Sequence, residues 1–267
     1  MSPARETGPD TATQPNSLAS IQERVAAGRI PWIGPLLLVS ARSFMWMASQ
    51  GLLALVFLAR HRPAPWREAT YWWSVCGTLG DIVCLIGLRY FTRREGIRLR
   101  DLLGPIRMRR GRDLFLGLCY LLLVFPFFMG GGYLAQMLFY GSTGMNPATY
   151  LVHAHALPVW AMVYSVTLWW LISSPTEEAT YQAYVLPRLE VLTGRTWIAV
   201  AIVGFWATAQ HCAFGFIPDW RFLACRFLAF LPGCLVIIGI YLRTRRLMPL
   251  IFAHWPMDIA AVLLTAF

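Results

Sequence analysis

The chain has 267 residues, of which 57% are hydrophobic and only 13% are charged. Because a soluble domain carries about 25% charged residues, this composition excludes an ordinary soluble protein. Several uncharged apolar runs reach the roughly 20 residues that a helix needs to cross a bilayer, and the short alternating segments of a β-barrel are not seen. We therefore expect an all-α protein, a polytopic transmembrane helical bundle.

The net charge is strongly positive, at +10, and all 23 basic residues are arginines. Such a balance could indicate nucleic-acid binding, but the arginines cluster beside the apolar runs. We expect them to contact the lipid bilayer and orient the chain in it, with no nucleic-acid partner. The six cysteines lie inside or at the ends of apolar runs without CxxC spacing, so we expect small core residues and no disulfides.

The first 30 residues form a separate N-terminal segment. Residues 1–16 are polar and rich in Pro and Thr, which predicts disorder, and they lack the pattern of a cleavable signal peptide. Residues 17–29 predict a short amphipathic helix on the membrane surface. The transmembrane helical domain then takes up residues 31–267.

Seven spans are expected in this domain. The fourth is long for one span, and Pro175 either kinks it or divides it, in which case the bundle has eight spans. Three glycines at 130–132 predict a bend or a close helix approach in the third span. The seven spans cover residues 31–59, 69–91, 113–139, 156–187, 196–214, 222–242 and 247–266.

The arginines fall mainly on one side of this arrangement. They gather in the N-terminal segment, in the 92–112 loop and in the turns after the fourth and sixth spans, whereas the opposite side holds Arg60, Arg62, Arg67 and Arg221. Because positive loops stay in the cytoplasm, we expect a cytoplasmic N-terminus and an external C-terminus. The all-arginine composition suggests a bacterial chain, hence a multi-pass protein of the inner cell membrane.

Charged residues inside a span are costly, so each one predicts a partner or a function. From the expected span ends and a rise of about 1.5 Å per residue, Glu177, His211, His254 and Asp258 all lie roughly 10–22 Å deep. His254 and Asp258 are four residues apart and share a helix face, and Glu178 adjoins Glu177. These residues therefore predict a polar site inside the bilayer.

The remaining charged residues and histidines carry a weaker signal. We expect Asp81 and Arg89 to form a structural pair within the membrane, and Arg42 and Arg226 belong to the same weaker set. The two histidines of the HAH stretch at 153–155 could bind a metal, but no partner residues are visible near them.

The stretch Ser174-Pro175-Thr176-Glu177 also permits a purely structural interpretation. Ser174 at the N-cap, Pro175 at the first helical position and Glu177 at the third fit a capping box. A membrane helix would then end at Ser173, and an ordinary surface helix would begin. This alternative explains Glu177 without chemistry, but it leaves His211 unexplained.

Three motifs resemble those of the CPBP family of intramembrane endopeptidases, which includes the CAAX prenyl proteases. EEATYQ at 177–182 is similar to the family's EExxxR, and ATAQH at 207–211 to its FxxxH. HWPMD at 254–258 fits its HxxxN or HxxxD. The resemblance covers roughly residues 155–267, and the motifs lie within 173–267.

The chain departs from these motifs at two positions. Gln182 stands where the family has arginine, which removes a cation that would pair with a motif carboxylate. Ala207 stands where the family has phenylalanine, although Phe205 and Trp206 are its neighbours in sequence. The other motif residues are retained, which favours activity.

The resemblance implies a peptide hydrolase with five catalytic residues, Glu177, Glu178, His211, His254 and Asp258. Glu177 would take a proton from the attacking water, aided by His211. His254 and Asp258 would face the substrate's carbonyl oxygen, and since an ionised aspartate cannot donate a hydrogen bond, Asp258 would orient His254 or be protonated. No cofactor is required on this interpretation.

A metal-based mechanism is an alternative that uses the same residues. Glu177, His211 and His254 also match a ligand set for catalytic zinc or another divalent metal, with Glu178 or Asp258 as the base or as a support for a ligand. The sequence does not separate the two mechanisms, and we favour water activation without a metal.

The expected substrate is a membrane-anchored protein or peptide, cleaved near the cytoplasmic half of the bilayer. Two other functions stay open. One is a catalytically inactive binding or scaffold protein on the same fold, which Gln182 and Ala207 motivate. The other is a small proton transporter, against which the lack of internal repeats and of paired broken helices counts.

Overall fold

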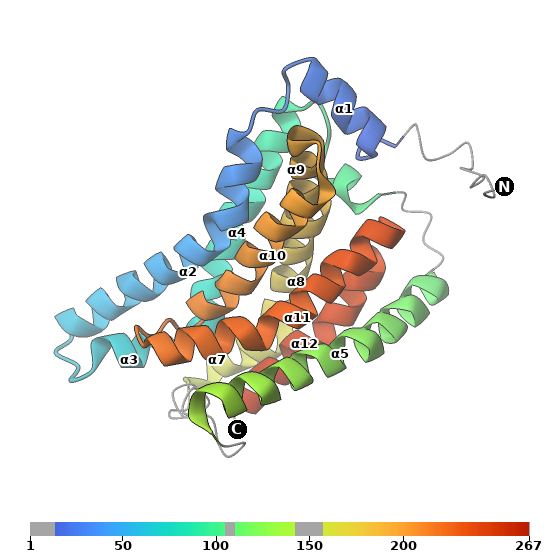
Figure 1. Cartoon of the computed structure of the whole chain (residues 1–267). Coiled ribbons are helices and arrows are strands. Elements are labelled where there is room, and N and C mark those ends of the chain that lie inside the picture. Colours follow the sequence, from blue (N-terminus) through green and yellow to red (C-terminus); the bar gives the residue numbers. More distant parts are fainter. Residues whose placement is uncertain (1–13, 105–109, 142–156, 267) are drawn as a thin grey trace.

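The structure is a computed structural model of the chain, and it describes residues 14–104, 110–141 and 157–266. The regular secondary structure of these residues is entirely helical, which confirms the expected all-α bundle (Figure 1). The helices are α1 (Leu18–Ala26), α2 (Ile33–Ala59), α3 (Pro65–Thr70), α4 (Trp73–Arg94), η1 (Leu99–Leu103), α5 (Arg110–Tyr140), α7 (Val159–Tyr164), η2 (Ser165–Trp169), α8 (Trp170–Glu178), η3 (Ala179–Val185), α9 (Leu186–Thr193), α10 (Thr196–Ala213), α11 (Trp220–Thr244) and α12 (Met248–Ala266).

Each of the seven expected spans corresponds to one helix or to one continuous helical run. Among the described residues, four helices are long and apolar enough to cross a membrane: α2, α4, α5 over Gly111–Tyr140, and α11. The apolar part of α12, Met248–Leu263, is shorter. The fourth expected span runs unbroken from α7 to α9, so Pro175 does not divide it, and the eight-span alternative lacks its break.

The run from α7 to α9 is the centre of the bundle. Every residue from Thr176 to Leu189 is buried, as expected of a helix that other helices surround. Two of its turns, η2 and η3, are π-helical, and η3 begins directly after Glu178. Such wide turns are frequent at functional sites, because they change which face of the helix a side chain occupies.

Helix α5 lies at the edge of the bundle and exposes large apolar side chains. Leu122, Leu134 and Leu138 are 66%, 67% and 70% exposed, which suits contact with lipid tails. On its inner face, a Cβ at Gly131 would lie 2.5 Å from the backbone oxygen of Ala229 in α11. The predicted close approach of the third span is therefore confirmed at Gly131.

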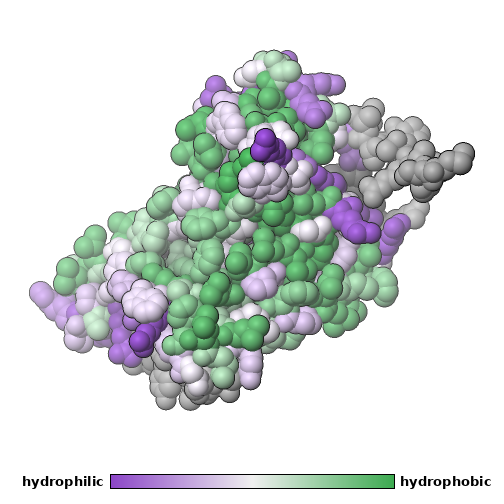
Figure 2. All heavy atoms as spheres, in the orientation of Figure 1, coloured by the Kyte–Doolittle hydropathy of each residue, from purple (hydrophilic) through white to green (hydrophobic). Residues whose placement is uncertain are grey.

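The surface of the molecule is also divided into apolar and hydrophilic regions. On the face shown in Figure 2, apolar residues cover the middle of the bundle, and hydrophilic residues gather mostly towards its ends. This pattern is typical of a membrane protein, whose apolar belt faces the hydrocarbon.

The N-terminal helix packs onto the bundle instead of standing apart. The short helix expected at 17–29 is present as α1, which Ser17 caps by accepting from the Ser20 N–H at 3.3 Å. Ile21 is fully buried, and the Asn16 side chain donates to the Ala183 carbonyl at 2.9 Å. Disorder was predicted for residues 1–16, and it is wrong at Asn16, which these contacts hold against the bundle. Residues 1–13 lie outside the described residues.

Two further expectations concern cysteine and histidine. All six cysteines are free, so the expected absence of disulfides is confirmed. The metal site considered for the histidines at 153–155 lies outside the described residues.

Candidate active site

Glu177 and Glu178 lie in the middle of the central helix, at the end of α8. They are 8% and 2% exposed, and Pro175 lies inside α8 instead of at the start of a new helix. The capping box is therefore not formed, and the surface helix that it predicted does not exist. The hydroxyl of Ser174 donates instead to an Asp258 carboxylate oxygen at 2.6 Å.

A chain of polar contacts joins α8 to α12 through His254. The Nδ1 atom of His254 lies 2.9 Å from a carboxylate oxygen of Glu178, and its Nε2 atom lies 3.6 Å from one of Asp258. The first distance is a hydrogen bond, and the second is too long for one. The imidazole is therefore fixed by Glu178, and Nε2 is left for another partner.

Glu177 pairs with a cation that comes from α2. The guanidinium of Arg42, which is fully buried, donates through Nη2 to Glu177 at 3.2 Å and through Nη1 to Asp81 in α4. Its Nε donates to the Gln210 side chain at 2.7 Å, and Nη2 also reaches Ser173 at 3.3 Å. One arginine thus connects four helices around Glu177.

Close packing of α2 on α4 brings Arg42 and Asp81 together. The indole of Trp46, one turn after Arg42, fits against Gly77 and Gly80 and donates to the Gly77 carbonyl at 3.1 Å. The guanidinium of Arg42 lies 5.3 Å from the centre of this indole. A side chain at Gly80 would collide with the indole, so the two helices could not approach as closely.

The expected pair of Asp81 with Arg89 is wrong. Arg89 is exposed and lies two turns further along α4, whereas Asp81 is fully buried and pairs with Arg42. The sequence flagged both Arg42 and Asp81 as costly charges in a span. It could not show which helices are neighbours, and the contact between α2 and α4 decides the pairing.

His211 lies at the end of α10 between aromatic rings. Its imidazole stacks on Phe230 of α11 with a centroid distance of 4.0 Å and an interplanar angle of 15°, and Phe214 meets it edge-on at 5.2 Å. The side chain is 8% exposed. Neither Phe205 nor Trp206 takes this place, so the ring beside His211 comes from another helix.

A cavity of about 420 Å³ joins these groups. Glu177, His211, His254 and Asp258 all line it, whereas Glu178, which contacts His254, does not. The structure thus brings four of the five predicted residues to one cavity and places the fifth next to it. Aromatic rings form much of the remaining wall: Trp73, Phe125, Phe128, Trp169, Phe214, Phe222 and Phe230.

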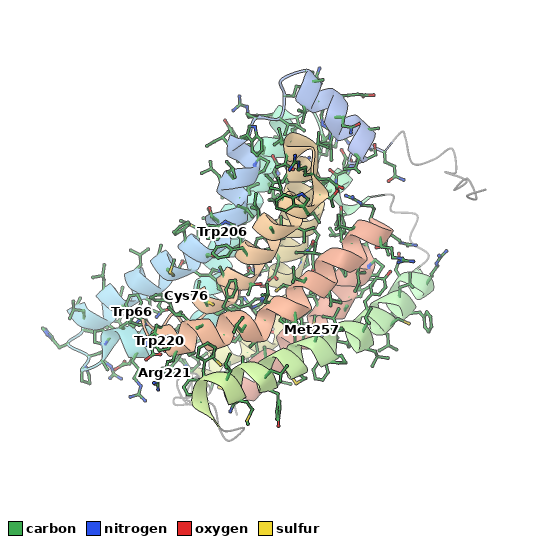
Figure 3. All side chains as sticks on the ribbon, in the orientation of Figure 1. Trp66, Cys76, Trp206, Trp220, Arg221 and Met257 are labelled. Atoms are coloured by element: carbon green, nitrogen blue, oxygen red, sulfur yellow. The ribbon has the colours of Figure 1, made fainter. Side chains whose placement is uncertain are left out.

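The cavity lies in the half of the bundle away from α1. Its walls come mainly from the middle and second half of α5 and from the first half of α11, which Cys234 and Ile237 extend. Trp73 at the start of α4 and Phe214, directly after the end of α10, complete them. Because the helices alternate in direction, these parts all lie towards the end that carries α3 (Figure 1). Met257 of α12, labelled in Figure 3, also lines the cavity.

The sequence left open a metal site at Glu177, His211 and His254. Among the described residues, no three His, Cys, Asp or Glu side chains are grouped so that they could hold a metal ion.

The comparisons with known proteins agree with the motifs. Residues 158–260 match the protein-family model described as Type II CAAX prenyl endopeptidase Rce1-like. The family predicted from the motifs is thereby confirmed over this part of the chain. No curated protein and no solved structure matches the chain.

Proposed function

Through residues 158–260 this chain belongs to the family of Rce1-like type II CAAX prenyl endopeptidases, and we propose that it is an intramembrane peptide hydrolase acting on a membrane-anchored protein or peptide. One observation carries the proposal. A single cavity is lined by polar side chains from α8, α10 and α12, namely Glu177, His211, His254 and Asp258.

Glu177 is the base in this proposal. Its carboxylate is held by Arg42 at 3.2 Å yet still lines the cavity, where a water molecule and the scissile bond would lie. The water would lose a proton to Glu177 as its oxygen attacks the peptide carbonyl. His211 faces the same cavity and would assist in moving that proton to the leaving amine.

His254 would stabilise the charge that develops on the carbonyl oxygen. Glu178 holds Nδ1 at 2.9 Å, which fixes the plane of the ring, and the His254 side chain lines the cavity. When the imidazole is protonated, both nitrogens donate, and Nε2–H is free for the oxyanion. Asp258, held by Ser174, would keep the ring in this position.

The arginine distribution supports a cytoplasmic α1 end in a bacterial inner membrane. With that orientation, we propose cleavage at middle depth, in a cavity that extends into the outer half of the bilayer instead of the cytoplasmic half. A membrane-impermeant thiol reagent should label Arg221→Cys in intact cells, and Arg195→Cys only after lysis. The reverse labelling would contradict this orientation.

The alternative function is a non-catalytic binding or scaffold protein on the same fold. Gln182 and Ala207 motivated it, because they remove a cation and an aromatic ring from the motifs. Arg42 supplies a cation to Glu177, and Phe230 supplies a ring to His211, so both groups are present at the site. This favours the hydrolase over the alternative.

The proposal is tested with the full chain in proteoliposomes and a library of acyl-anchored fluorogenic peptides. Glu177→Gln and His254→Ala should each lower kcat by about 100-fold or more, since each removes a group that acts in the transition state. Glu190→Gln is the matched control, because Glu190 pairs with Arg245 and does not line the cavity.

Full cleavage by both site variants would contradict the hydrolase and favour the scaffold. We also propose that no metal is required, so treatment with a chelator should leave the rate unchanged. A loss of activity that zinc restores would instead favour the ligand set Glu177, His211 and His254.

A further inference from the structure

A positively charged side chain, Arg226, lines the same cavity, and the proposed reaction does not use it. It lies in the second turn of α11, four residues before Phe230, whose ring stacks on His211. At a rise of about 1.5 Å per residue, the two Cα atoms are separated by about 6 Å along α11. Arg226 is therefore about one helical turn from the level of the His211 imidazole.

The guanidinium of Arg226 is restrained in position, but only one of its three nitrogen atoms donates a hydrogen bond within the described residues. Its Nε donates at 2.6 Å to the carbonyl of His211, which caps the end of α10. The guanidinium carbon lies 5.5 Å and 5.8 Å from the ring centres of Phe222 and Phe230, a cation–π arrangement that restrains its position. These contacts leave the N–H groups of both Nη atoms available to a ligand.

The other arginines inside the bundle have carboxylate partners. Arg42 pairs with Asp81 and Glu177, and Arg188 pairs with Glu95. In the part of the chain that the structure describes, Arg226 has no such ion pair, and its one hydrogen bond goes to a backbone carbonyl. Because a charge inside a membrane helix is costly, an arginine without a counter-charge beside a reaction site indicates an anionic ligand.

We propose that Arg226 binds a carboxylate of the peptide substrate, one or two residues from the cleaved bond. The inference rests on the proposed hydrolase function. The spacing fits, because one extended residue spans about 3.3–3.6 Å. The guanidinium carbon lies 5.8 Å from the centre of the Phe230 ring, which in turn stacks on the His211 imidazole at 4.0 Å. The carboxylate is either the C-terminus of the peptide or an Asp or Glu side chain, since both present the same two oxygens to the Nη atoms.

The surroundings of Arg226 suit this role. Aromatic walls keep water away from the ion pair, which strengthens the attraction between guanidinium and carboxylate. A neutral amide in the same place would leave the charge of Arg226 uncompensated. We therefore expect the site to discriminate between a peptide carboxylate and its amide.

The test uses the full chain in phosphatidylcholine nanodiscs and acyl-anchored fluorogenic peptides in three forms. These are a free-acid peptide, the same peptide as a C-terminal amide, and the amide with an added aspartate. The wild type should cleave the free acid with a kcat/KM about tenfold or more above the neutral amide, mainly through KM. Rescue of the amide by the aspartate would identify a side-chain carboxylate as the ligand, and a lack of rescue would identify the C-terminus.

Arg226→Gln should abolish this preference. The variant keeps an N–H donor for the His211 carbonyl but removes the charge, so it separates the anion site from the helix cap. Arg221→Gln is the matched control, because Arg221 is exposed near the start of α11, does not line the cavity and should keep the full preference (Figure 3). If Arg226→Gln does not fold, Arg226→Lys should fold and show a reduced preference, since it keeps the charge without the paired N–H groups.

Binding to the Glu177→Gln variant, followed by fluorescence anisotropy, separates this inference from the proposed reaction. If the free-acid peptide binds, its binding depends on Arg226, and the wild type does not cleave it, the anion site is supported and the hydrolase proposal is contradicted. If the wild type cleaves without a preference for the carboxylate, or if the preference persists in Arg226→Gln, the proposed anion site is contradicted. The proposed hydrolase function is then unaffected. Loss of the preference in nanodiscs that contain phosphatidylglycerol would assign Arg226 to a lipid headgroup and overturn the proposal.

Discussion

Two buried arginines hold carboxylates in two parts of the bundle, and they do so differently. Arg188, near α1, donates through Nε and Nη2 to both oxygens of Glu95, at 2.8 Å and 2.5 Å. Its Nη1 donates to the Tyr184 carbonyl at 3.0 Å and to the Asn16 side chain at 3.2 Å. Both charged groups of this pair are satisfied by partners within the protein.

Arg42, by contrast, shares one positive charge between Asp81 and Glu177. Only Nη2 reaches Glu177, and the side chain of this glutamate is 11% exposed, against 2% for Glu95. The difference teaches that burial of an ion pair does not by itself indicate function. What distinguishes Glu177 is that its carboxylate is both held by a cation and open to a cavity.

Among the substitutions that test this comparison, Arg42→Gln is expected to lower the cleavage activity most. Without the guanidinium, Glu177 loses its support, and since small misplacements of a catalytic group are costly, we expect cleavage per folded molecule to fall about 100-fold. The rate is measured with the acyl-anchored peptides in proteoliposomes and divided by the folded fraction. Arg42→Lys, which keeps the charge but not the forked geometry, should lie between the variant and the wild type.

A second substitution sharpens the same prediction. Gln182 lies five residues after Glu177 within the π-helical turn η3, where the family's motif has arginine. Adding Gln182→Arg to Arg42→Gln should restore part of the activity if the two positions supply the same cation. Normal cleavage by Arg42→Gln alone would show that Glu177 needs no counter-ion, and the contrast between the two arginines would then fail.

The sequence predicted the helices and the motif residues well, because both depend on local patterns. Long uncharged runs defined the helices, and costly charges in apolar runs pointed to Glu177, His211 and His254. The length of the fourth span was correct, but the effect of Pro175 was not predictable, because the π-helical turns around it depend on packing against other helices.

The partners of these residues were not predictable, because they come from distant parts of the chain. Arg42 lies 135 residues before Glu177, and Asp81 was assigned to Arg89 on its own helix. Phe230 stacks on His211 from a different helix than the motif's aromatic position. In each case the deciding contact is between helices, and a single sequence carries no signal for it.

The smallest effect on catalysis is expected from Arg188→Gln, although its effect on stability should be large. Removing one partner of a buried ion pair typically costs about 3–5 kcal/mol, because Glu95 would remain buried without a counter-charge. Unfolding can be followed with a thiol-reactive dye, since Cys76, Cys84 and Cys234 are buried in the folded chain.

Cleavage per folded molecule should stay within about twofold of the wild type, because Arg188 neither lines the cavity nor contacts a residue that does. Arg42→Gln should lose stability to a similar degree, since it leaves Asp81 and Glu177 without their cation. The two variants are thus separated by activity and not by melting temperature. A hundredfold loss of activity in folded Arg188→Gln would mean that the α1 end of the bundle controls the site, and that its ion pair is more than a structural support.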